Sequence, residues 1–167
     1  MGWKLKTTVL LSLGILLVVS LGFGYVVYAR YQGNAYAVQI AASFNAASLV
    51  NGQETYTQPD RAVVSSYEGR RFVILPDNYN ALVSLLRKDH AMPPFRRVGE
   101  DAPLSIVICD SARLRIAPDG DSVDGAFVCY TDDAGKQYTM HVRGGNIWKQ
   151  LVEYATTGYA KRRNLAL

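Results

Sequence analysis

The pattern of apolar and polar positions divides the chain near residue 30. Residues 9–29, VLLSLGILLVVSLGFGYVVYA, contain no charged side chain. A helix rises about 1.5 Å per residue, so a segment of this length crosses a hydrocarbon core of roughly 30 Å. The pattern therefore predicts a transmembrane signal-anchor helix over residues 9–29, followed by a separate domain.

The residues that flank this apolar run predict its orientation. Basic residues precede it within residues 1–8, whereas only one basic residue follows it closely. Because an excess of basic residues marks the cytoplasmic side of a span, residues 1–8 are expected to be a cytoplasmic stub and the domain extracytoplasmic. Aromatic rings favour the membrane interface. The expected interface residues are Trp3, Lys4, Lys6, Tyr25, Tyr28 and Arg30.

An alternative is a signal peptide that is cleaved after Ala29. The triplet Val27-Tyr28-Ala29 has the small residue at its end that signal peptidase accepts. A cleaved signal peptide typically has an apolar core of about 7–15 residues, and the run here is longer. The length favours a retained anchor. Under either interpretation the domain lies outside the cytoplasm, and cleavage would make it secreted.

Residues 30–60 are predicted to form a helix or stalk and then a polar linker. Tyr36, Ile40, Phe44 and Ala47 fall on one stripe of a helix. This stripe allows two interpretations. The segment either extends the membrane helix as a stalk or is the first helix packed on the domain.

Residues 61–160 alternate in the manner of short strands separated by two helices. Two apolar-alternating runs flank Glu68-Gly69 and predict a hairpin, and a helix is expected to begin at Asp77. Strands are predicted over residues 104–109 and 112–117, with a turn-rich loop at 118–125. Sequential hairpins with few crossovers predict an α+β domain, with an antiparallel sheet and two or three packed helices.

The last two strands, residues 126–131 and 137–142, are specific enough to predict their register. Gly135 suits the left-handed position of a three-residue hairpin loop. The predicted pairs are Asp132 with Lys136, Tyr130 with Tyr138, Val128 with Met140 and Ala126 with Val142. This register places Phe127, Cys129, Thr131, Thr139 and His141 together on the opposite face.

A final helix is predicted from Asn146 to Gly158, with residues 161–167 as a basic tail. The distribution of charge along the chain is more informative than the net charge. The chain carries a net charge of +4, and three of its basic residues flank the apolar run. The domain body is therefore near neutral, which predicts no basic face for nucleic acid.

Two cysteines and a histidine carry the candidate chemistry. Outside the cytoplasm, Cys109 and Cys129 are candidates for a disulfide, which would close a loop of about 20 residues. Alternatively, Cys129 or Cys109 acts as a nucleophile with His141, because Cys129 and His141 are diagonal neighbours in the predicted register. The third possibility is two small buried side chains without chemistry.

No metal site or cofactor is predicted. The carboxylates Asp119, Asp121 and Asp124 fail the calcium-loop spacing and are ordinary turn residues. The leading hypothesis is a single-pass anchor that presents a non-enzymatic binding domain to a protein or cell-envelope component, in contact with membrane lipid. The alternative is an exported cysteine hydrolase or transpeptidase. Self-association through the first 50 residues is a further possibility.

Overall fold

The computed structural model describes residues 2–53, 63–87 and 98–163, and the side chains within residues 8–49, 63–87 and 98–157. Its elements, in chain order, are α1 (Gly2–Gln53), β1 (Val64–Tyr67), β2 (Arg70–Val73), the 3-10 turn η2 (Pro76–Asn78), α2 (Tyr79–Leu86), β3 (Leu104–Ile108), β4 (Ala112–Asp119), β5 (Ser122–Thr131), β6 (Gln137–Arg143) and α3 (Ile147–Arg163).

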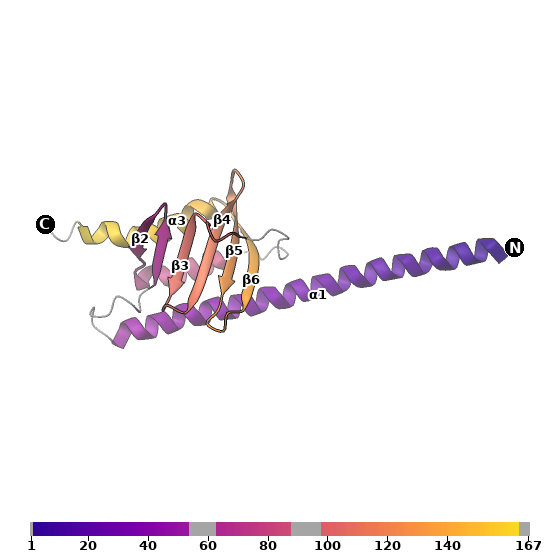
Figure 1. Ribbon diagram of the computed structural model, residues 1–167, viewed down its shortest axis with the longest axis horizontal. Helices are drawn as coiled ribbons and strands as arrows, with labels where there is room; N and C mark the ends of the chain where they lie inside the picture. Colours follow the sequence, from indigo (N-terminus) through magenta and orange to yellow (C-terminus); the bar gives the residue numbers. More distant parts are fainter. Residues whose placement is uncertain (1, 54–62, 88–97, 164–167) are drawn as a thin grey trace.

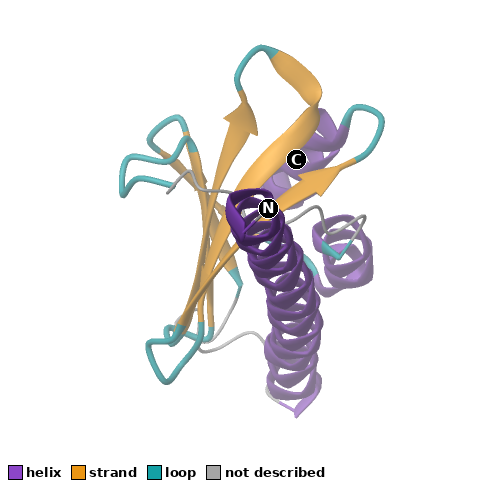
Figure 2. Ribbon diagram, turned by 90° about the vertical axis from the view of Figure 1, so that its right-hand side faces the viewer, coloured by secondary structure: helices purple, strands orange, loops and turns teal. Residues whose placement is uncertain are grey.

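The strands form one six-stranded sheet in the order β2-β1-β3-β4-β5-β6, and every neighbouring pair is antiparallel. The helices α2 and α3 and the C-terminal part of α1 lie on the same face of the sheet (Figure 1, Figure 2). The predicted α+β class is therefore confirmed. The pairing of β1 with β3 brings together strands that α2 separates in the sequence.

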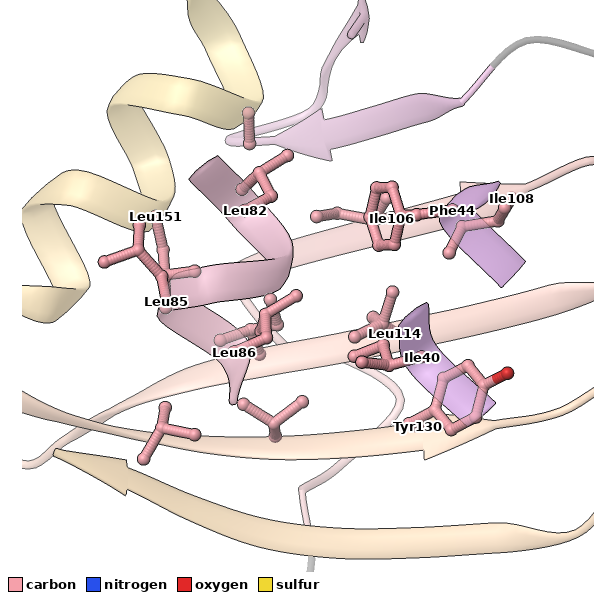
Figure 3. Packing of buried hydrophobic residues seen from close by; sticks show 14 of the residues in the cluster. Ile40, Phe44, Leu82, Leu85, Leu86, Ile106, Ile108, Leu114, Tyr130 and Leu151 are labelled. Atoms are coloured by element: carbon pink, nitrogen blue, oxygen red, sulfur yellow. The ribbon is translucent and has the colours of Figure 1, made fainter. Parts of the chain in front are cut away.

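The core lies between this sheet and the three helices (Figure 3). The stripe predicted on α1 is confirmed, because Tyr36, Ile40 and Ala47 are fully buried and Phe44 is 1% exposed. The Tyr36 hydroxyl donates a hydrogen bond of 3.1 Å to the carbonyl of Leu86. The Phe44 ring lies edge-on to Tyr79 at 5.5 Å. These contacts make the C-terminal part of α1 an integral part of the domain.

The helix α1 is continuous over 52 residues, which corresponds to about 78 Å. Both interpretations of the segment that carries this stripe are therefore correct, because it extends the apolar helix and also packs on the domain. The apolar part projects past β6 without covering the sheet (Figure 1). Its large aliphatic and phenylalanine side chains between residues 9 and 27 are 47–71% exposed. This helix is long and apolar enough to cross a membrane.

The turn residues determine the geometry of two hairpins, β1–β2 and β5–β6. Both Glu68 and Gly69 have positive φ, which gives the two-residue turn that matches strand twist. The predicted register of β5 and β6 is confirmed for all four pairs. The Asp132 carboxylate also accepts a hydrogen bond of 2.7 Å from the Lys136 amide, and Gly135 has a φ of 79°. Local turn geometry therefore fixes this register.

Three element ends differ from the predictions. The loop expected at residues 118–125 is only a tight turn, because β4 continues to Asp119 and β5 begins at Ser122. The N-cap residue of α2 is Asn78, whereas the helix was expected to begin at Asp77. The reason is that Asp77 belongs to the 3-10 turn that precedes α2. The helix α3 continues through Gly158 to Arg163, so the predicted basic tail begins inside a helix. A glycine inside a helix, such as Gly158, lowers the stability of the helix by only about 1 kcal/mol relative to alanine, and the neighbouring turns can offset this loss.

Candidate binding face of the sheet

No described helix covers the second face of the sheet, which we call the open face (Figure 2). Strand register places one side chain from each strand in a line across it. This line, the polar row, runs in the order Arg71, Ser66, Ser105, Arg115, Cys129 and Thr139. Except for the buried Cys129, the members of this row are at least partly exposed, so hydrogen-bonding groups are accessible on five of the six strands.

A groove of about 500 Å³ lies on the open face over β3, β4 and the ends of β5 and β6. Its polar lining consists of Glu100, Ser105, Arg113, Arg115, Thr131 and Gln137. The strand β4 positions both arginines, because they alternate with the buried residues Leu114 and Ile116. The alternation of this strand was predicted from the sequence and is confirmed. The groove that its arginines line was not predicted.

The two arginines of the groove are held differently. Arg113 is exposed, whereas Arg115 is half-buried. The guanidinium of Arg115 donates to the Cys129 sulfur at 3.5 Å, and this thiol is only 4% exposed. Within the described residues no carboxylate lies at ion-pair distance from either arginine. Most of their N–H donors therefore remain available to a ligand.

Four arginines occupy the open face, although the net charge of the chain is only +4. Arg71 on β2 and Arg143 on β6 share the open face with Arg113 and Arg115, as the register requires. The same face also carries the carboxylates of Glu100 and Asp119. The absence of a basic face for nucleic acid therefore stays a prediction. The composition gives only the sum of the charges, whereas the face that each arginine occupies depends on pairing between distant strands.

A second cluster on the open face surrounds His141. Its Nε2 atom lies 3.0 Å from the Oδ2 atom of Asp119, and its ring stacks on Phe127 at 4.5 Å. The contact has ion-pair distance without hydrogen-bond geometry, because Nε2 is buried and has no hydrogen-bond partner within the described part of the chain. Gly125 makes this close approach possible, since it has no side chain beneath the pair.

Replacing Gly125 by alanine is expected to lower the free energy of unfolding by about 1–3 kcal/mol. The new Cβ atom would lie 2.9 Å from the Cβ atom of Asp119 and 3.0 Å from Nε2 of His141, so both residues must move. Urea unfolding monitored by circular dichroism measures the change. Gly145→Ala is the matched control, because nothing lies within 4 Å of its Cβ position. Equal stability of the two variants would contradict the close contact.

The structure does not bring Cys129 and His141 into contact, although they share a face as predicted. Cys129 pairs with Thr139 and contacts Arg115, while His141 pairs with Phe127 and faces Asp119. No hydrogen bond joins the thiol and the imidazole. A nucleophile and its base need such a contact, so the described geometry does not assemble a cysteine–histidine pair.

The predicted disulfide is also not formed, because neither Cys109 nor Cys129 is bonded to another cysteine. Cys109 lies in the tight turn that joins β3 to β4, just beyond their last pair, Ile108 and Ala112. Cys129 lies on β5 opposite Arg115. At least three residues, or about 10 Å, therefore separate them along the strands. Disulfide-bonded cysteines have Cα atoms within about 7 Å, so this register prevents the bond.

The residues predicted at the membrane interface all lie on α1. Tyr28 is exposed on α1, where its hydroxyl accepts a hydrogen bond of 3.1 Å from Gln32. Tyr25 is half-buried and Arg30 is exposed. The side chains of Trp3, Lys4 and Lys6 lie outside the described part. Among the described residues no group of three histidine, cysteine or acidic side chains is arranged to hold a metal ion.

Comparison of the chain with protein-family models, curated proteins and solved structures finds no match. Two features of this molecule bear on its function. One is the apolar projection of α1, and the other is the open face with its groove.

Proposed function

We propose that this protein is a single-pass, membrane-anchored binding domain outside the cytoplasm, which contacts a protein or an envelope component. The observation that carries the proposal is the division of α1 into two parts. Its apolar side chains before Tyr28 are exposed, whereas Tyr36, Ile40 and Phe44 are buried in the domain. Exposed apolar surface of this extent is costly in water and favourable in lipid.

The flanking residues support the proposed orientation. Lys4 and Lys6 precede the apolar run, and Arg30 is the only basic residue close after it. This asymmetry favours a cytoplasmic N-terminus. Residues 9–29 would then span the membrane as a retained anchor, with Tyr28 and Arg30 at the outer headgroups.

The continuity of α1 would hold the domain close to the membrane surface. The buried stripe begins at Tyr36, and β6 is the strand nearest to the projecting part of α1 (Figure 1). A fixed domain at the surface would meet membrane-bound partners at high effective concentration.

The open face supports a binding role in preference to the cysteine hydrolase or transpeptidase. It presents a polar row across six strands and a groove with two arginines that have no carboxylate partner in the described structure. The thiol and imidazole that the enzyme would use have other neighbours. A surface of hydrogen-bonding groups without an assembled nucleophile favours recognition over bond cleavage.

Reporter fusions at the two ends of the full chain test the proposed topology. A reporter active only in the cytoplasm is expected to work at the N-terminus and to be silent at the C-terminus. Activity at both ends would contradict the proposal. The intact mass of the purified protein is expected to correspond to an uncleaved chain, and a mass that begins at Arg30 would show that the domain is released.

A further inference from the structure

We infer that the groove over Arg113 and Arg115 binds an oxyanion, the carboxylate or phosphate group of the partner. This inference deepens the proposed function, because it assigns a ligand chemistry to the same open face. It rests on the donors gathered in the groove, on the absence of a carboxylate partner for either arginine among the described residues and on their position at an accessible surface.

The donors of the groove converge from neighbouring strands. Arg113 and Arg115 are two residues apart on one face of β4, so their backbones lie about 7 Å apart. Ser105 is opposite Arg115, and Thr131 is opposite Arg113. A planar guanidinium matches the two oxygens of a carboxylate or phosphate, and the adjacent hydroxyls can donate to the same group.

The half-buried state of Arg115 distinguishes it from a solvated surface arginine. It carries five N–H donors, yet within the described structure its only side-chain acceptor is the Cys129 sulfur, a weak one. Partial burial reduces its access to water, so the remaining donors favour an anionic acceptor. By contrast, the Asp119 carboxylate on the same strand is already engaged with His141.

Glu100 gives the inference a second, opposite test. It lines the same groove and carries the negative charge that opposes an anionic ligand. The groove therefore holds two positive charges and one negative charge among its lining residues. Removing the positive charge must weaken binding of an anion, whereas removing the negative charge must strengthen it.

The test is calorimetric titration of the full chain in a phosphate-free detergent such as dodecyl maltoside. The probes are inorganic phosphate and acetate in separate titrations at low ionic strength, where screening is weakest. We expect saturable binding of at least one probe, and the probe that binds identifies phosphate or carboxylate chemistry. Arg113→Gln is expected to weaken it about tenfold, the loss of one charge-assisted contact.

Two further variants complete the test. Glu100→Gln is expected to tighten binding about threefold and keeps the inference testable if Arg113→Gln is impaired in folding. Arg70→Gln is the matched control, because Arg70 is exposed in the same sheet but is opposite Tyr67 on the helix-covered face. Binding of neither probe, or equal affinities for all variants, would overturn the inference.

Failure here is distinguishable from failure of the proposed function. A chain that is anchored with its domain outside, yet binds neither probe, removes the oxyanion site and leaves the anchored domain. A chain that binds phosphate or acetate with both of its ends in the cytoplasm keeps the site and removes the proposed topology.

Discussion

Replacing Phe44 by alanine is expected to lower the free energy of unfolding of the domain by about 3–5 kcal/mol. The side chain is 1% exposed and packs edge-on against Tyr79, beside Ile106 of the sheet (Figure 3). Its loss leaves a cavity between α1, α2 and β3, in addition to the lost burial. Urea unfolding of the full chain in detergent, followed by near-UV circular dichroism, measures the change.

Leu49→Ala on the same helix is the matched control. Leu49 is 73% exposed, so its truncation is expected to change stability by no more than about 0.5 kcal/mol. A similar small effect from both variants would show that α1 is a stalk separate from the folded domain. A large difference would establish that residues after Gly33 belong to the core, and that cleavage after Ala29 would release a domain with this helix still attached.

The parts of the fold that local patterns determine could be predicted from the sequence. The register of β5 and β6 follows from the turn that ends at Gly135 and from the separation of apolar and polar side chains. The stripe on α1 follows from helical periodicity, because Tyr36 and Phe44 recur at the spacing of one helix face. In both cases residues close in sequence decide the geometry.

The open face could not be predicted, because it depends on pairing between distant segments. The polar row requires β1 to pair with β3 across α2, which no local pattern specifies. Only that pairing aligns Ser66 with Ser105 and places Arg71 on the face of Arg115. The same dependence explains why the disulfide prediction was wrong. The apolar runs that contain Cys109 and Cys129 do not show how their strands are aligned with each other.

Replacing Val19 by arginine is expected to remove most of the chain from the membrane. Val19 lies at the centre of residues 9–29 and is 63% exposed on the projecting part of α1. An arginine at the centre of a span costs about 2.5–3.5 kcal/mol on insertion scales, or roughly 100-fold in partitioning. The share of the protein that resists alkaline carbonate extraction from membranes measures the effect.

Val38→Arg is the control that separates anchoring from folding. Val38 is on the same helix and similarly exposed at 66%, but it lies beyond the proposed span and away from the buried stripe. Its substitution is expected to leave the carbonate-resistant share unchanged. If α1 were a helix in water throughout, both arginines would be equally tolerated. Loss of extraction resistance from Val19→Arg alone therefore requires that lipid surrounds the first part of α1 and that Val38 lies outside the lipid.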